Sequence, residues 1–267
     1  MPDSVATPGH SSVHLEVERH EVSRVPRSVR SFSALLAAFA LLGLCKVSAQ
    51  APAAPRYVVV LDAAHGGAET GGLLGDPAND PSIQPQLEKN FTLALSVRLR
   101  SLLAARGIYV VTTRESDTAV DPDRRAEIAN RANAQACLTL HASQTGAGVH
   151  IYASSLSPAE PTTMLPWKTA QAAWITRSLA LAGILNSSLA QGGFNVALGR
   201  TDLPAINSMA CPALAIEIGR QNSQDKASSG FDDPNYQAHI AQALAAAIIE
   251  WKSNGSRTTA STEAARP

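Results

Sequence analysis

Strand-like and helix-like segments alternate along residues 56–252, and this alternation restricts the fold more than any other feature of the sequence. Short apolar runs typical of buried strands are followed by longer segments that place apolar residues on one helical face. The expected strands cover residues 57–61, 108–112, 136–140, 149–152 and 213–218, and the expected helices cover residues 87–105, 121–134, 166–189 and 233–251. The pattern predicts an α/β fold, a single domain with a largely parallel central sheet flanked by helices on both faces.

The N-terminal part of the chain has a different pattern. Residues 31–44 form an uncharged apolar run that follows several arginines and precedes the small-residue sequence Val47-Ser48-Ala49. This order is typical of a secretory signal peptide, so we expect residues 1–49 to direct export to the periplasm or out of the cell. An uncleaved anchor and a core helix are alternative interpretations of the run, which is short for a membrane span. Cys45 raises the further alternative of lipidation.

The segments that flank the domain are short and show no apolar periodicity. We expect residues 50–55 to form a linker and residues 253–267 to form a disordered tail, because neither segment can bury a core of its own. Residues 56–252 then form the compact part of the chain, as one domain.

Charge and cysteine content exclude several functional classes. The chain has 22 basic and 22 acidic residues and a formal net charge of zero, so it lacks the basic character expected of a nucleic-acid-binding protein. Its three cysteines are too few for a disulfide-rich scaffold or a four-cysteine zinc site. Cys137 and Cys211 are able to pair in an oxidising compartment, but the sequence favours two buried free thiols.

Four residues suited to metal or proton chemistry lie at the ends of expected elements. His65 follows the first strand, His141 follows the third, Glu217 lies at the end of the fifth, and Glu88 begins the first helix. Functional groups of parallel sheets gather beyond the carboxyl ends of the strands. Two imidazoles and a carboxylate match a catalytic zinc site, and a second carboxylate can transfer protons. Taken alone, His65, His141 and Glu88 fit a structural role better than a functional one. Glu217 is evenly balanced, because burying a carboxylate without a partner is costly.

Seven segments follow one another in order along residues 57–249: Val60–Gly67, Glu88–Leu93, Thr113–Asp117, Arg125–Asn130, Leu140–Ala142, Gly148–Tyr152 and Pro212–Gly219. In this order they resemble the type 3, zinc-dependent N-acetylmuramoyl-L-alanine amidases of bacterial cell walls. The resemblance implies a zinc-hydrolase-like domain in which His65, Glu88 and His141 bind Zn²⁺ and Glu217 is the general base and then the general acid. The implied reaction is hydrolysis of the amide between N-acetylmuramic acid and L-alanine in peptidoglycan.

The sequence departs from the family pattern without losing an expected ligand or base. Ala63-Ala64 replaces the usual Pro-Gly, Ser143 replaces an Asn, and Arg220 replaces an aromatic residue. Arg220 is a candidate for binding a peptide carboxylate of the substrate, and a solvated surface arginine is the alternative. We interpret His150 as a structural strand residue.

Two other functions remain open at this stage. One is a non-catalytic peptidoglycan-binding protein with the same fold, and the other is a zinc peptidase with a different amide substrate. We expect a monomer that binds peptidoglycan but no nucleic acid, and the sequence identifies no activator protein.

Overall fold

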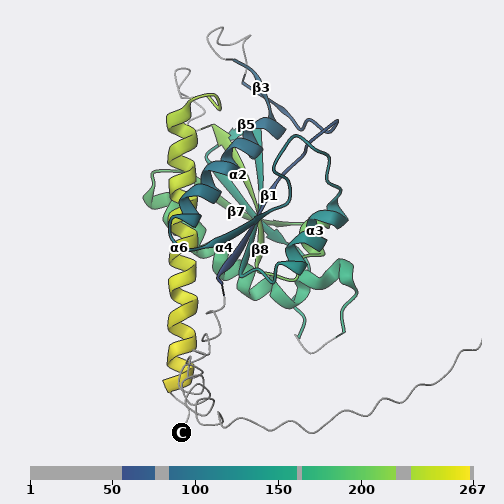
Figure 1. Cartoon of the computed structure of the whole chain (residues 1–267), viewed down its shortest axis with the longest axis vertical. Coiled ribbons are helices and arrows are strands. Elements are labelled where there is room, and N and C mark those ends of the chain that lie inside the picture. Colours follow the sequence, from purple (N-terminus) through teal and green to yellow (C-terminus); the bar gives the residue numbers. More distant parts are fainter. Residues whose placement is uncertain (1–55, 76–83, 161–163, 221–229, 265–267) are drawn as a thin grey trace, which may run out of the picture. The chain divides into compact units, whose positions relative to one another are not determined.

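A six-stranded sheet with the strand order β4-β1-β5-β8-β6-β7 forms the centre of the molecule (Figure 1). The computed structural model describes residues 56–75, 84–160, 164–220 and 230–264, with side chains as far as residue 255. The strands are β1 (Val58–Ala63), β4 (Tyr109–Thr112), β5 (Ala136–Ala147), β6 (Val149–Ser154), β7 (Val196–Thr201) and β8 (Ala213–Arg220). All neighbouring strands are parallel except β6 and β8, which are antiparallel, so the predicted largely parallel sheet is confirmed.

Helices cover both faces of this sheet, as the sequence predicted (Figure 1). They are α2 (Glu88–Ala104), α3 (Pro122–Arg131), the 3₁₀ helix η1 (Trp167–Trp174), α4 (Ile175–Gln191), α5 (Pro204–Asn207) and α6 (Pro234–Ala264). Apolar side chains of α2, α4 and α6 form the larger core with one face of the strands, and α3 and α5 form a smaller core on the other face. Two residue pairs, β2 (Leu73–Leu74) and β3 (Gln86–Leu87), make a separate antiparallel ribbon ahead of α2.

The burial of β8 explains why its apolar residues form a continuous run instead of alternating with polar ones. Leu214, Ile216 and Ile218 pack in the larger core, whereas Ala213 and Ala215 pack in the smaller one. A strand that is buried on both faces has apolar residues at almost every position. Glu217, which is half-buried, interrupts this run inside the strand, three residues before β8 ends at Arg220, so the expectation that it lies at the strand end is corrected.

Several elements differ from the sequence prediction, among them β7 and the end of α6. Strand β7 was not predicted, because its residues are half-buried or exposed and include Gly199 and Arg200, so no apolar run marks it. The prediction of a disordered tail from residue 253 is wrong for residues 253–264, since α6 continues to Ala264. This segment contains no proline, and a helix already formed against the core extends at little cost, one hydrogen bond per added residue.

The prediction of free thiols at Cys137 and Cys211 is also wrong, because the two residues form a disulfide. Cys137 lies near the start of β5, and Cys211 lies two residues before the neighbouring strand β8. The adjacency of β5 and β8 brings the two Cα atoms to 6.3 Å although 74 residues separate them in the sequence. Sequence spacing alone does not reveal that adjacency.

The expected leader (residues 1–49) and linker (residues 50–55) lie outside the described residues. Among the helices that the structure describes, none is both long enough and apolar enough to cross a membrane.

Candidate metal centre

His65 lies just beyond the carboxyl end of β1, in a backbone conformation that is unusual for a side-chain-bearing residue. Its φ angle is 60°, in the left-handed region, and the φ angles of Gly66 and Gly67 are 132° and 62°. A Cβ atom on Gly66 would lie 2.2 Å from the carbonyl oxygen of Thr118, so only glycine fits there. The strained conformation of His65 is of the kind that concentrates at functional sites.

The loop that follows His65 is attached to the segment after β4. The backbone N–H of Gly67 donates to Asp117 Oδ1 at 2.8 Å, and Lys89 Nζ donates to the carbonyl oxygen of Gly67 at 2.8 Å. Lys89 and Asp117 also form an ion pair at 2.6 Å. These contacts connect Asp117, which follows β4, to the loop that carries His65.

Glu88 is the first residue of α2 and is buried, with 6% of its surface exposed. Its Oε2 accepts the N–H of Gly72 at 2.9 Å, and its Oε1 accepts the N–H of Ala142 at 3.0 Å. Gly71 lies directly against it: a Cβ there would stand 2.6 Å from Glu88 Oε2 and 2.6 Å from His65 Cδ2. The absence of a side chain at residue 71 therefore allows the imidazole and the carboxylate to meet.

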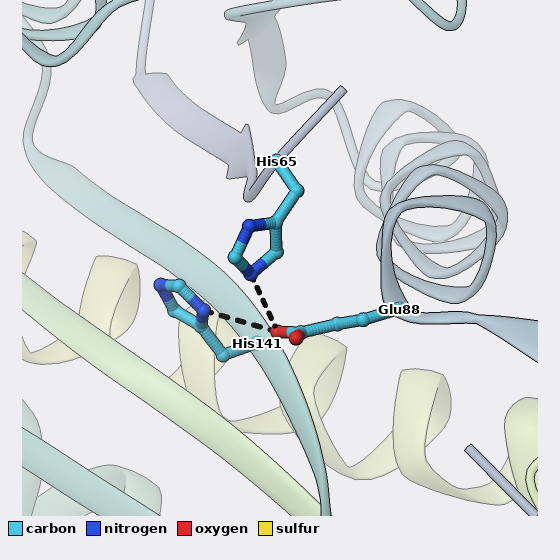
Figure 2. A group of neighbouring side chains, drawn as sticks. All are labelled: His65, Glu88 and His141. Atoms are coloured by element: carbon cyan, nitrogen blue, oxygen red, sulfur yellow. Dashed lines mark hydrogen bonds and ion pairs between the residues drawn. The ribbon is translucent and has the colours of Figure 1, made fainter. Parts of the chain in front are cut away.

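His65, Glu88 and His141 converge at one point (Figure 2). Glu88 Oε1 lies 3.0 Å from His65 Nε2 and 3.1 Å from His141 Nδ1, and the three candidate ligand atoms lie within 4.8 Å of one another. The sequence prediction that these three residues belong together agrees with this geometry. In the part of the chain that the structure describes, no other group of three or more His, Cys, Asp or Glu side chains is arranged to hold a metal ion.

The charge state of Glu88 suits a metal ligand. Burial raises the pKa of its carboxyl group, but hydrogen bonds from His141 and from the N–H groups of Gly72 and Ala142, together with the charge of His65, outweigh burial and lower this pKa to about 2. The carboxylate is therefore ionised at neutral pH. One carboxylate oxygen and two imidazole nitrogens are the donor set of a three-ligand catalytic metal site.

Glu217 lies beside this group because of strand register. It pairs with His141 across the parallel strands β5 and β8, so the two side chains leave the same face of the sheet. Glu217 is half-buried, in contrast to most of its neighbours in β8. On its other side it pairs with His150 of β6, which the sequence had suggested was merely structural.

Arg220, the predicted carboxylate-binding residue, is the last residue of β8 and pairs with Ala147 at the far end of β5. It is half-buried, and its Nε is buried with no hydrogen-bond partner among the residues that the structure describes. The structure records no contact between Arg220 and the three clustered residues, and its substrate role remains a prediction.

Comparison with known proteins relates residues 59–250 to the family model described as N-acetylmuramoyl-L-alanine amidase. The chain is 32% identical over 148 residues to the N-acetylmuramoyl-L-alanine amidase Rv3717 of Mycobacterium tuberculosis. The matched region covers 52% of this chain and 59% of that protein. It is 33% identical over 104 residues to the N-acetylmuramoyl-L-alanine amidase AmiA of Escherichia coli, and this match covers 38% of this chain and 33% of that protein. The chain thus matches less than two thirds of the length of either relative.

Solved structures of amidases share the fold. The catalytic domain of CwlV from Bacillus (Paenibacillus) polymyxa superimposes with a TM-score of 0.56 at 22% identity and covers 74% of this chain and 98% of its own. CwlD of Clostridioides difficile, solved in complex with the GerS lipoprotein, gives a TM-score of 0.55 at 20% identity and covers 74% and 99%. At these identities the likeness concerns the α/β fold alone.

Proposed function

Because the chain belongs to the N-acetylmuramoyl-L-alanine amidase family, we propose that it is a zinc-dependent hydrolase of peptidoglycan. It cuts the amide bond between the lactyl group of N-acetylmuramic acid and the L-alanine of the stem peptide. The observation that carries this proposal is the convergence of His65, Glu88 and His141 with Glu217 in register beside them.

The three clustered residues fit the metal by their chemistry. Zn²⁺ prefers imidazole nitrogen and carboxylate oxygen in catalytic sites, and three protein ligands leave room for the reactants. His65 Nε2, His141 Nδ1 and Glu88 are the atoms and residue that would hold it. When bound, zinc supplies Lewis acidity, which polarises a carbonyl group and lowers the pKa of water.

Glu217 is the residue that moves protons in the proposed reaction. Its carboxylate accepts a proton from the attacking water as the new C–O bond forms at the lactyl carbonyl. It then donates that proton to the alanine nitrogen as the C–N bond breaks, so that a lactyl carboxylate and a free amine result. Its place beside His141 in the strand register supports this role.

Arg220 is proposed to bind a carboxylate of the stem peptide. A half-buried guanidinium with an unused donor at Nε is suited to such a ligand. An Arg220→Gln variant should therefore raise KM for peptidoglycan fragments more than it lowers kcat, and equal effects on an amidated stem peptide would contradict the assignment.

We also propose that the protein acts in the cell envelope, either in the periplasm or after secretion. The signal-like pattern of residues 1–49 and the disulfide between Cys137 and Cys211 both suit an oxidising compartment. A monomer remains our expectation. The complex of CwlD with a lipoprotein makes an activator protein worth seeking for this chain.

Product analysis tests the function. The zinc-loaded protein is incubated with purified peptidoglycan, and soluble products are identified by mass spectrometry. Stem peptides with a free N-terminal L-alanine support the proposal. Binding without any product favours a peptidoglycan-binding protein, and cleavage within the stem peptide favours a zinc peptidase, so either result would refute the amidase.

A further inference from the structure

Two buried arginines from distant parts of the sequence hold the backbone from Ala63 to His65. Arg125 donates to the carbonyl oxygens of Ala63 and His65, each at 2.8 Å. Arg114 donates to the carbonyl oxygens of Ala63 and Ala64, each at 2.9 Å. Every carbonyl from the end of β1 to His65 therefore accepts a guanidinium N–H.

These guanidinium groups are themselves fixed. Arg125 and Arg114 are only 6% and 4% exposed, and Asp62, which is 1% exposed, accepts from Arg125 at 2.5 Å and from the hydroxyl of Thr113 at 2.6 Å. An interior ion pair of this kind costs desolvation free energy and is weak evidence for stability. Two of the Arg125 hydrogen bonds nevertheless go to the backbone segment that carries His65.

The imidazole ring of His65 has a separate support. His65 Nδ1 lies 3.1 Å from Glu69 Oε1, while Nε2 on the opposite side of the ring lies 3.0 Å from Glu88 Oε1. Backbone hydrogen bonds between Gly66 and Glu69, at 2.9 and 3.3 Å, close a tight turn that returns the Glu69 carboxylate to the ring. A carboxylate thus faces each ring nitrogen, and a carboxylate only accepts hydrogen bonds. If Nε2 gives its lone pair to a metal, Nδ1 must carry the proton, and Glu69 is placed to accept it.

We propose that Glu69, Arg114 and Arg125 are positioning residues that hold His65 as a metal ligand: Glu69 selects the Nδ1–H tautomer, and the arginine pair fixes the left-handed backbone. Carboxylates that orient a ligating histidine in this way commonly change metal affinity about 10–100-fold when removed. The inference rests on the metal site of the proposed function and not on the substrate.

Metal affinity of the full chain tests Glu69. Competition with a chromophoric chelator measures the Kd for Zn²⁺ in the wild type, Glu69→Ala and Glu69→Gln, with Glu115→Ala as the control. Glu115 is a matched choice, since its side chain is 71% exposed against 70% for Glu69, and it pairs with Arg100 instead of a histidine. We expect Glu69→Ala to raise the Kd about 10–100-fold, Glu69→Gln to raise it less because its amide oxygen still accepts from Nδ1–H, and Glu115→Ala to leave it unchanged.

Two further measurements keep the test independent of folding and of peptidoglycan cleavage. Proton–nitrogen correlation spectra of the zinc-loaded protein should show His65 as the Nδ1–H tautomer. Arg125→Lys keeps a cation beside Asp62 but cannot reach the two carbonyl oxygens, and it should raise the Kd, whereas Arg124→Lys on the exposed side of α3 should not.

A Glu69→Ala protein that is folded and binds zinc as tightly as the wild type would overturn the proposal, as would an Nε2–H tautomer of His65. If Arg125→Lys does not fold, the Glu69 variants and the spectra decide. A protein that binds zinc as expected but releases no stem peptide would contradict the amidase function while leaving this inference intact.

Discussion

Glu217 and His141 occupy paired positions on the neighbouring parallel strands β8 and β5, so a residue suited to proton transfer lies next to a residue suited to metal binding. The two are 76 positions apart in the sequence and share a face of the sheet only because the strands lie side by side in this register. Because the proposed metal ligands and the proposed base are different residues, substitutions should affect metal binding and turnover separately.

Glu217→Gln should abolish turnover without loss of metal. The amide cannot take up a proton, and general acid–base groups contribute about 10²–10⁴-fold to rate, so kcat should fall by that factor. Product release from peptidoglycan and zinc content by atomic absorption are measured on the same preparation. A variant that keeps near-wild-type kcat would remove Glu217 from its proposed role, and loss of zinc would make it a ligand instead.

Gly71→Ala should disrupt the ligands, whereas Gly107→Ala should not. Both glycines have φ angles in the left-handed region, 66° and 68°, so an alanine is strained by roughly 1–2 kcal/mol at either position. A Cβ at residue 71 collides with Glu88 and His65, and a Cβ at residue 107 meets nothing within 4 Å. Calorimetric zinc titration should find weakened binding in Gly71→Ala alone; equal zinc affinities of the two variants would contradict the steric explanation.

Stability of the metal-free protein should depend on the ionisation of Glu88 at acidic pH. The folded state lowers the pKa of Glu88 from 4.5 to about 2, so its carboxylate favours folding at pH values above 4.5, and this contribution disappears as the pH falls through about 2. The shift corresponds to about 3 kcal/mol as an order of magnitude. Urea unfolding of wild type and Glu88→Gln between pH 7 and pH 2 should show a free-energy difference that shrinks as the pH falls. A constant difference would contradict the assigned shift.

Removal of the disulfide should destabilise the domain without altering the site. The bond joins residues 74 positions apart and restricts the unfolded chain, and such bonds contribute about 2–4 kcal/mol. We expect the Cys137→Ala/Cys211→Ala variant to unfold at lower denaturant concentration and to keep its zinc affinity. Alkylation of the denatured wild type, followed by mass spectrometry, should find no free thiol at either residue unless a reductant is added first.

The mature protein should begin at Gln50 when the full chain is expressed in an exporting host. The apolar run 31–44 and the small residues before position 50 predict cleavage there. N-terminal sequencing of the exported protein tests this. Retention of residues 31–44 in the membrane fraction would favour the anchor, and a lipid on Cys45 would favour the lipoprotein alternative.

Much of the fold and the main site residues were accessible from the sequence, for identifiable reasons. Apolar runs such as residues 57–61 and 213–218 are continuous because their strands are buried on both faces, so the sheet and its flanking helices were predictable. His65 comes four residues after the first run and His141 directly follows the run 136–140, and functional groups gather where parallel strands end. The structure extends β5 past His141 to Ala147, yet the two histidines still meet. The positions of the two histidines in the sequence therefore predicted that they lie close together, as they do.

Only the tertiary structure decided which elements are neighbours and which distant residues touch. Strand β7 lacks an apolar signal, because edge strands need only one half-buried face, and the pairing of Cys137 with Cys211 depends on which strands are neighbours. The positioning contacts of Arg114 and Arg125 join residues 50 to 62 positions apart. Local periodicity records whether a residue is buried, whereas register and chain packing determine what it touches. The convergence of His65, Glu88 and His141 could therefore be predicted from the sequence, but not the contacts that hold His65 in place.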